Sequence, residues 1–522
     1  MTYANKFRLV MMAGAAATAL SACGPEDIAS PGEGTVIVLP GTSGGTSGGS
    51  TSGGTSGGTT SGGTGTGPAA DCPAGFTNGG VIANLRNCQI SGRLSADLNI
   101  PKRAGTIYSL AGRVDVGTDV GADGTAAGGK SVTLSIDPGV VVFGSGGLDF
   151  LVVQRGSKLN AVGTSTQPII FTSRRNVEGG ATDDSQGQWG GIVLLGRAPI
   201  SDCLGAATGG TAQCQQQFEG SADAPYGGAI ASDSSGALQY VQIRYSGYEI
   251  APNKEINGLT LAGTGTGTLV DHVQVHNSSD DAVEWFGGRT NAKYLVLTGN
   301  DDDNLDTDLG YKGAIQFVIA VQRASGQSGD SIIESDSNGN EDAVPRQDTR
   351  LANVTFVHRS TLSSSVNAIL LRGGTDYRIA NAVVTSPRFC LDIDGAPTMQ
   401  AADPAKDELG EPQFRSVALS CTAGAVNDDG NITKAAIDAL FAADPNNKPG
   451  HTSSLTNVFV NGANETAVPA FTGLAGWSSF FTSVNYIGAV KDASDTWYRG
   501  WTCDSSTANF GSGSSCTSIP AL

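Results

Sequence analysis

Short runs of alternating apolar and polar residues follow one another through the middle of the chain. Alternation with a period of two predicts β-strands that bury one face. The four clearest runs are residues 237–245, 269–276, 291–298 and 314–320. Within the last three, Val273, Leu295 and Phe317 are spaced by 22 residues and then by 22 again. This spacing leaves no room for a helix between strands, so it predicts a solenoid of parallel strands with these side chains superposed.

The polar segments that follow these strands repeat with the same period. Residues 277–284 and 299–306 are both rich in Asp and both end in an acidic residue. Further strand-like runs, cut by Gly or Pro, continue from residue 131 to residue 425. The prediction is an all-β fold, a right-handed parallel β-helix over 131–425 with one coil per 22 to 30 residues.

The segments outside this region lack the regular pattern. We expect an N-terminal cap of the solenoid at 71–130 and a C-terminal cap at 451–522. Between solenoid and C-terminal cap, 426–450 contains an amphipathic helix for which Asn431 is a plausible N-cap. It is interpreted as a short helical insertion.

The start of the chain predicts export. A basic start and an apolar run at 9–20 form a secretion signal that is too short to span a membrane. It ends in Leu20-Ser21-Ala22-Cys23, which resembles the lipobox of bacterial lipoproteins. The resemblance implies removal of signal peptide 1–22 and lipidation of Cys23. The alternative is an ordinary signal peptide followed by a disulfide cysteine.

The residue after the predicted lipidated cysteine indicates the membrane to which the protein is sent. Gly24 is not the Asp that retains such proteins at the inner membrane, so the resemblance implies an outer-membrane location, facing the periplasm or the cell surface. Residues 23–70 are mostly Gly, Ser and Thr and are predicted to be a flexible tether.

The net charge of the chain limits the kinds of partner that the protein is expected to bind. The net charge of −18 disfavours nucleic acid and an anionic membrane surface, so the predicted membrane attachment is through the lipid anchor only. An acidic exported protein instead suits contact with cations.

The cysteine count also indicates an oxidising compartment. Apart from Cys23, the eight cysteines are even in number and fall into four sequence-near pairs. Sequence does not fix connectivity, but near-neighbour pairing is the preferred interpretation. A zinc–thiolate site is disfavoured because the chain has no C-x-x-C and only 4 His. The expected pairs are Cys72 with Cys88, Cys203 with Cys214, Cys390 with Cys421, and Cys503 with Cys516.

Stacking with a period of 22 residues would gather acidic side chains into a column. Residues one coil apart lie ~4.8 Å apart, so Glu284 is expected over Asp306. Allowing for longer later coils, the column continues through Glu334, Arg372 and Asp392. Carboxylates this close repel unless they are solvated or bind a cation such as Ca²⁺. The candidate metal ligands are Asp280, Asp281, Glu284, Asp302, Asp303, Asp306 and Glu334.

Three interpretations of this column stay open at this stage. It is a solvated stack of acidic turns, a structural calcium site, or a calcium-assisted active site in which Arg372, Asp302 and Asp303 are catalytic. A second candidate set lies on the outward strand face and combines aromatic, His and Arg side chains that suit sugar binding, although such residues are also common on any solvated sheet. These residues are Tyr240, Arg244, His272, His276 and Tyr294.

The coil pattern over about 130–420 resembles the pectin-lyase-like β-helix superfamily, and Val270-Asp271-His272-Val273 is similar to a strand piece of pectate lyases. In those lyases, calcium-binding Asp residues and an Arg base act on uronic acid polymers. The resemblance implies the first role for Asp280, Asp281, Asp302 and Asp303, and the second for Arg372. The paired Asp residues also resemble polygalacturonases, but the downstream Gly-His-Gly of that group is missing.

The chain as a whole more closely resembles non-catalytic surface lipoproteins of Gram-negative bacteria that assist outer-membrane receptors. The leading hypothesis is therefore an outer-membrane lipoprotein whose β-helix binds a glycan or other polymer and passes it to an outer-membrane transporter. The alternatives are a calcium-dependent polysaccharide lyase or glycoside hydrolase, and a structural or adhesive surface protein.

Overall fold

The computed structural model describes residues 67–522, except 220, 222, 252–253, 325–329, 338, 363–365 and 429–430. The predicted signal peptide, Cys23 and nearly all of the predicted tether lie outside the described residues. No helix in the described part of the chain is long and apolar enough to cross a membrane.

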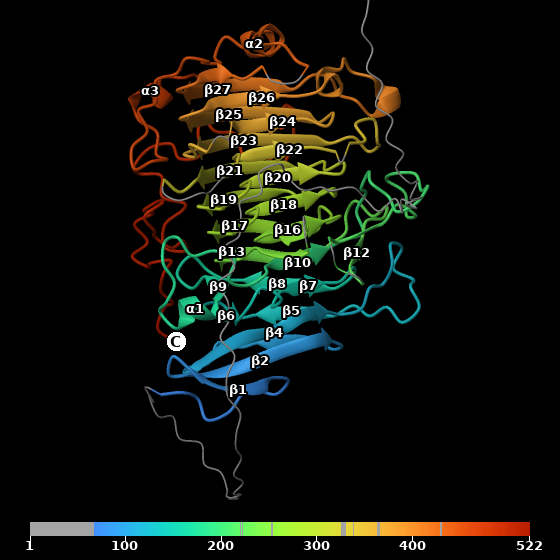
Figure 1. Cartoon of the computed structure of the whole chain (residues 1–522), viewed down its shortest axis with the longest axis vertical. Coiled ribbons are helices and arrows are strands. Elements are labelled where there is room, and N and C mark those ends of the chain that lie inside the picture. Colours follow the sequence, from blue (N-terminus) through green and yellow to red (C-terminus); the bar gives the residue numbers. More distant parts are fainter. Residues whose placement is uncertain are drawn as a thin grey trace, which may run out of the picture.

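The chain winds into a stack of coils held together by parallel strand pairing (Figure 1). One side of the stack is a ladder of short strands, here called the short-strand ladder. It consists of β7 (Leu151–Val153), β10 (Ile192–Leu195), β16 (Leu259–Ala262), β18 (Val283–Phe286), β20 (Leu305–Asp308), β22 (Ile333–Ser335), β24 (Asn367–Leu371), β26 (Phe389–Ile393) and β28 (Gly424–Val426).

The remaining sides of the stack are built by long bent strands. These are β13 (Gly236–Arg244), β17 (Leu269–His276), β19 (Ala292–Thr298), β21 (Ala314–Val321), β23 (Asp348–Val357), β25 (Asp376–Ser386) and β27 (Gln413–Cys421). In the preceding coils these sides are built by shorter strands, β3 (Leu98–Ile100), β5 (Thr133–Ile136), β6 (Val141–Gly144), β8 (Lys158–Val162) and β9 (Ile169–Ser173). Two longer strands, β2 (Leu85–Leu94) and β4 (Thr106–Val116), contribute to one of these sides, and their last three residues continue the short-strand ladder.

Each long strand bends at one residue in the left-handed backbone region. Tyr240, His272, Tyr294 and Phe317 have φ of 52°, 53°, 59° and 61°, and they occupy equivalent places in successive coils. This conformation costs about 1–2 kcal/mol for a residue with a side chain, so packing must hold the bend in place. The bend lets a single strand contribute to two sides of the stack.

The predicted superposition of core side chains is confirmed for Val273 and Leu295, which are paired and fully buried. It is wrong for Phe317, because Leu295 pairs with Val318 instead. Phe286 pairs with Asp308 and Ala292 pairs with Ile315, so the chain advances by 6 residues between these positions in one coil and by 7 in the next, which shifts the register by one. Phe317 consequently occupies the bend.

The ends of the stack differ from those predicted. At the N-terminal end, β1 (Thr77–Ile82) pairs antiparallel with β2, and parallel pairing begins with β2 and β4, inside the predicted cap. At the other end, α2 (Lys434–Ala442) begins after Thr433 and packs Ile437 and Phe441 on the core. The helix interpreted as an insertion is therefore the C-terminal cap.

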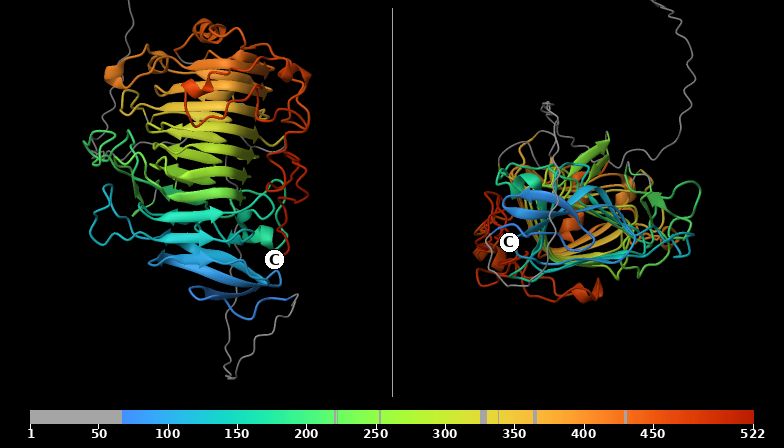
Figure 2. Two further views of the ribbon diagram at one scale, coloured as in Figure 1. Left: turned by 180° about the vertical axis from the view of Figure 1, so that it is seen from behind. Right: turned by 90° about the horizontal axis from the view of Figure 1, so that it is seen from below.

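Residues 451–522, predicted to be that cap, instead run down the side of the stack and end near α1 (Arg174–Val177) (Figure 1). We call this segment the strap; seen along the stack it lies opposite the loops around residue 210 (Figure 2). Buried amide side chains bind the strap main chain. The Gln274 side-chain amide accepts a hydrogen bond from the Cys503 N–H at 2.8 Å and donates one to the Cys503 carbonyl at 3.2 Å. Gln316 makes the same two hydrogen bonds with the main chain of Thr482.

The smaller elements lie in loops and in the strap. They are β11 (Gln216–Gln217), β12 (Pro225–Tyr226), β14 (Tyr248–Ala251), β15 (Lys254–Ile256), η1 (Ala396–Met399), η2 (Pro404–Lys406), α3 (Ala463–Thr466) and η3 (Leu474–Gly476). All four near-neighbour disulfides are confirmed: Cys72–Cys88, Cys203–Cys214, Cys390–Cys421 and Cys503–Cys516.

Glu465 organises the start of the strap. Its fully buried carboxylate accepts hydrogen bonds from the Ser454 amide at 2.8 Å, the Ser454 hydroxyl at 2.7 Å and the Gly462 amide at 3.0 Å, and lies 3.0 Å from His451 Nε2. Burial opposes ionisation, but these bonds together lower the pKa of Glu465 to about 2. The folded state therefore holds this group as a carboxylate.

We expect Glu465→Gln to lower the stability of the protein at neutral pH by roughly 2 kcal/mol, because the depressed pKa stabilises the folded state. The stabilisation by ionised Glu465 is fully present at pH values above the usual pKa of 4.5, and it is lost as the pH falls toward 2. Thermal unfolding across this pH range should show a shallower acid transition in the variant. An unchanged transition, matching that of the exposed control Glu411→Gln, would contradict the assignment.

Candidate functional site

A column of carboxylates lies on the outer face of the short-strand ladder. Glu284 pairs in register with Asp306, as the 22-residue period predicted, and Asp306 pairs with Glu334, as expected once the longer next coil is allowed for. On β18, Val283 and Trp285 point into the core, so the intervening Glu284 points outward. The same alternation turns Asp306 and Glu334 outward on β20 and β22.

Arg372 does not lie in this column, which corrects the predicted register. Glu334 pairs with Leu370, and Leu370 pairs with Asp392, so Arg372 follows the column position by two residues. Its guanidinium nevertheless returns to the column, where it forms an ion pair with Glu334 and a second with Asp336 at 2.9 Å. The side chain was thus correctly expected beside the acidic residues.

The turns before β18 and β20 add further carboxylates. The Asp281 carboxylate accepts a hydrogen bond from the Asp303 amide at 2.9 Å, and Asp303 accepts one from the Ser331 amide at 3.0 Å. Each acidic side chain is thereby fixed to the coil above it. The predicted metal ligands Asp280, Asp281, Glu284, Asp302, Asp303, Asp306 and Glu334 all belong to this one region.

The region also contains acidic residues that were not predicted from the sequence, and Asp308 and Glu219 are two of them. Asp308 lies two residues beyond Asp306 on the same face and accepts a hydrogen bond from the Asp336 amide at 3.1 Å, a position that strand alternation could have indicated. Glu219 comes from a loop far away in sequence and lies 3.9 Å from Lys254. No repeat links that loop to the coils, so the sequence carries no signal for its position.

The loop that carries Glu219 covers part of the short-strand ladder. Phe218 and Tyr226 pack against Phe286, which points outward from β18 two residues beyond Glu284. This apolar cover explains why the acidic residues beside it are poorly solvated: only 4% of Glu284 and 3% of Asp306 is exposed.

Burial is the main cause of the raised carboxyl pKa values in this region. It raises the pKa of Glu284, Asp306 and Asp308 well above the usual carboxyl range, and the neighbouring carboxylates raise it further. The same causes raise the pKa of Glu219 to about 8 and that of Asp330 to about 7. The column therefore resists ionisation unless a cation compensates the charge.

The donor chemistry fits a hard divalent cation. Asp281, Glu284 and Asp306 each offer an oxygen within 4.8 Å of the others, and Asp306 Oδ1 is buried without a hydrogen bond from any described residue. Such an oxygen is costly unless it binds something. Oxygen-only ligand sets favour Ca²⁺ or Mg²⁺ over softer metals.

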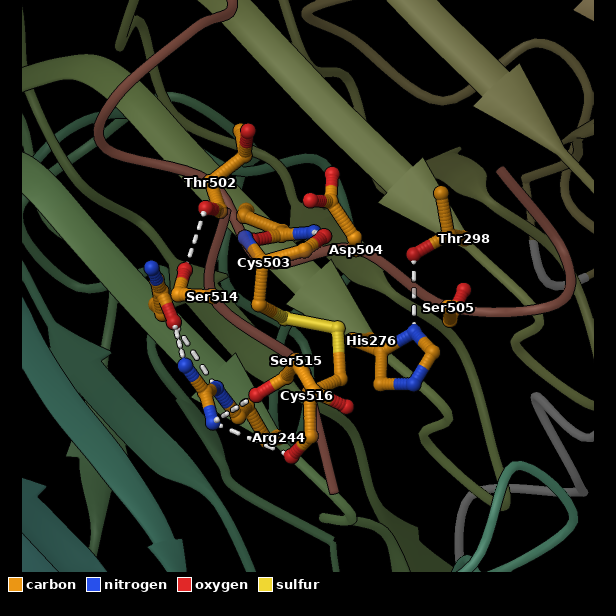
Figure 3. The surroundings of a disulfide bond; sticks show 12 residues. Arg244, His276, Thr298, Thr502, Cys503, Asp504, Ser505, Ser514, Ser515 and Cys516 are labelled. Carbon is orange, nitrogen blue, oxygen red and sulfur yellow. Dashed lines mark hydrogen bonds between the residues drawn. A yellow bond between two sulfur atoms is a disulfide. The ribbon is translucent and has the colours of Figure 1, made fainter. Parts of the chain in front are cut away.

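The face predicted to bind sugar is occupied by the strap (Figure 3). Arg244 and His276 are buried beneath the Cys503–Cys516 disulfide, with 1% and none of their surface exposed, so their predicted exposure is wrong. Arg244 donates to the carbonyls of Cys516 at 3.0 Å and Ser518 at 2.7 Å. These contacts assign Arg244 to strap attachment.

Burial also determines the protonation of these two side chains. It lowers the pKa of Arg244 to about 10, which leaves the guanidinium charged at neutral pH. Burial, followed by the nearby Arg244, lowers the pKa of His276 to about 3, so this imidazole is neutral.

The other three predicted sugar-binding residues form a stack. Successive ring centroids of Tyr240, His272 and Tyr294 lie 4.4 Å apart, one per coil. Trp501 contacts the His272 ring edge-on at 5.4 Å, and Trp497 packs against Tyr294 at 5.1 Å. Because the rings face one another, they do not present open platforms for a sugar.

We expect Asp306→Asn to stabilise the protein in the presence of a chelator, by the order of 1–3 kcal/mol near pH 8, because one buried like charge is removed. A raised carboxyl pKa contributes stability at low pH that is lost as pH rises toward the folded value. The melting temperature of the metal-free wild type should therefore fall from about pH 5 to pH 8, and the variant should fall less. The partly exposed Asp438→Asn on α2 is the control. A destabilised Asp306→Asn variant would contradict the electrostatic account.

Comparison with known proteins agrees with the strand ladders. Residues 118–502 match the family model of the pectate-lyase-like β-helix domain. No curated protein and no solved structure matches the chain. The family match covers well over half of the sequence, and the chain therefore belongs to the pectate-lyase-like β-helix domain family.

Proposed function

We propose that this protein binds a carboxylate-bearing polysaccharide on the outer face of the short-strand ladder and that a divalent cation, Ca²⁺ in the simplest case, links the two. The observation that carries the proposal is the column of buried carboxylates with an unpartnered oxygen at Asp306 and a guanidinium at its edge. Membership of a pectate-lyase-like family supports a carbohydrate as the ligand.

The cation would be held by Asp281, Glu284 and Asp306, with the partly exposed Asp280 and Asp302 nearest to solvent. When bound, Ca²⁺ accepts oxygen ligands from both protein and polymer and so joins two groups that otherwise repel. Arg372, whose side chain keeps 26% exposure, would add a charge-assisted hydrogen bond to a polymer carboxylate.

Binding without cleavage is favoured over a lyase. An arginine that removes a proton must reach its neutral form, which burial promotes. Although Arg372 is largely buried, the carboxylates of Glu334 and Asp336 outweigh burial and raise its pKa above the usual value. They hold the guanidinium in the charged form that binds anions.

A hydrolase is the second candidate, and one observation supports it. Glu219, with a pKa of about 8, would be protonated at neutral pH beside ionisable carboxylates. A protonated carboxyl next to an ionised one is the combination that glycoside hydrolysis requires. The release of reducing ends therefore has to be measured together with binding.

The sequence supports a surface location for this activity. The Leu20-Ser21-Ala22-Cys23 motif followed by a Gly/Ser/Thr-rich segment suits a lipid-anchored protein held away from the outer membrane. In that position the β-helix would capture polymer for an outer-membrane transporter. A structural or adhesive surface role is the outcome if no polymer binds.

To test the function, binding of the purified protein to polygalacturonate should be measured with Ca²⁺ and with a chelator. We expect binding only with Ca²⁺, and a loss of roughly tenfold or more in affinity for Arg372→Ala, since a charged hydrogen bond contributes ~1.5–3 kcal/mol. Arg174→Ala, on the surface of α1, is the matched control.

Three results would point elsewhere. An increasing ultraviolet absorbance from unsaturated product would establish a lyase, and new reducing ends would establish a hydrolase. Binding that is insensitive to the chelator, or no binding to any carboxylate polymer, would refute the cation-linked mechanism.

We further predict that Cys23→Ser moves the protein from the membrane fraction to the soluble fraction, because the acyl chains that anchor it are attached at this position. Fractionation of cells that express the wild type and the variant tests this. A variant that stays with the outer membrane would contradict lipid anchoring.

A further inference from the structure

Tyr248 presents an aromatic ring to solvent. Among the Phe, Tyr and Trp side chains of the described residues it alone is exposed, with 37% of its surface accessible, and the others are at least partly buried. The residue begins β14, which forms an antiparallel hairpin with β15. A single exposed apolar residue is ordinary on a protein surface, so the way in which this ring is held decides its meaning.

The ring of Tyr248 is supported on one face by the backbone of Gly147. A Cβ atom added to Gly147 would lie 2.0 Å from both Cγ and Cδ2 of Tyr248 and 2.2 Å from Cε2, well inside van der Waals contact. Such similar distances to three ring atoms place the glycine over the face of the ring and not at its edge. The exposed part of the side chain therefore includes the opposite face, which is free to contact a ligand.

The loop that carries Gly147 is fixed and extends the apolar surface. Leu148 follows Gly147 in the chain and is 60% exposed. The Asp149 carboxylate accepts hydrogen bonds from the main-chain amides of Gly112 and Ser145, both at 2.6 Å, which ties the loop to the preceding coil. The Tyr248 ring thus rests on a support that is in place before any ligand arrives.

Tyr248 also lies beside the acidic turns of the short-strand ladder. A Cβ atom added to Gly247, the residue before it, would lie 2.5 Å from the main-chain nitrogen of Ser279. The next residue, Asp280, is partly exposed. After burial, the charge of Glu255 on β15 is the largest cause that raises the pKa of Asp280, which places the hairpin close to this carboxyl group. A ligand that contacts Asp280 can therefore also reach the ring.

We infer that Tyr248 is a stacking platform on which one pyranose ring of the bound polysaccharide rests, with Leu148 extending the apolar surface. The inference rests on the proposed function and adds to it a contact that does not depend on charge. The C–H groups on one face of a sugar ring pack against an aromatic face, while the hydroxyl groups at the rim of the sugar stay free for hydrogen bonds. Because Gly147 fixes the ring in advance, little conformational entropy is lost on binding.

The test compares the affinities of the wild type and four variants for polygalacturonate in Ca²⁺. Tyr248→Ala should weaken binding roughly five- to tenfold, the size of one aromatic contact, whereas Tyr248→Phe should bind like the wild type because the ring and not the hydroxyl makes the contact. Gly147→Ala should match Tyr248→Ala, since the added methyl group would occupy the place of the ring. Gly146→Ala is the matched control, because a Cβ there meets no atom within 4 Å.

Salt dependence separates stacking from the contacts between charges. The ratio of the wild-type affinity to that of Tyr248→Ala should be the same at low and high ionic strength, because salt screens charge contacts and not stacking. Thermal melting checks that each variant is folded. Wild-type binding that both Tyr248→Ala and Gly147→Ala leave unchanged would overturn the platform while the proposed function stands. A wild type that binds no polygalacturonate would refute the proposed function and the platform with it.

Discussion

Parallel pairing between successive coils places each residue above its counterpart one coil earlier. The inward positions take advantage of this arrangement by stacking apolar side chains, as with Val273 under Leu295 and Leu295 under Val318. The same register also aligns the outward-pointing side chains, whatever their charge. It brings Glu284, Asp306 and Glu334 together even though like charges ~5 Å apart repel. The acidic column is therefore a consequence of the core.

Outward-pointing polar side chains are covered differently on the two sides of the molecule. On the long bent strands, the amides of Gln274 and Gln316 bind the main chain of the strap, which covers that side and excludes solvent. On the short-strand ladder, loops cover the acidic residues only in part, and Arg372 and Lys254 supply few positive charges. One side is closed by the chain itself, whereas the proposed cation and ligand would bind on the other.

Features that depend on the local repeat could be predicted from the sequence, whereas features that depend on distant segments of the chain could not. The 22-residue period specifies the register of Glu284 with Asp306, because the pairs β17 with β19 and β18 with β20 have the same 22-residue offset. It fails at Phe317, where the offset between paired residues increases from 22 to 23, and at Arg372, where insertions had to be assumed. Alternation correctly separates inward from outward residues but does not reveal what covers them.

Long-range packing accounts for the remaining errors. The strap returns to β13 and β17 from more than two hundred residues later, so Arg244 and His276 could not be recognised as buried from local pattern. The α2 helix was recognised as a helix, yet its position on the open end of the core depends on Phe414 and Phe441 meeting across the final coil. Glu219 reaches the acidic column from a loop that has no counterpart in the other coils.

The most direct test of the account is a crystal structure of the protein grown with terbium, whose anomalous signal locates calcium-type sites. The account predicts a strong peak beside Asp281, Glu284 and Asp306, with β18 and β20 paired so that Glu284 lies beside Asp306. Terbium bound elsewhere, or a shifted register that separates these two carboxylates, would contradict it.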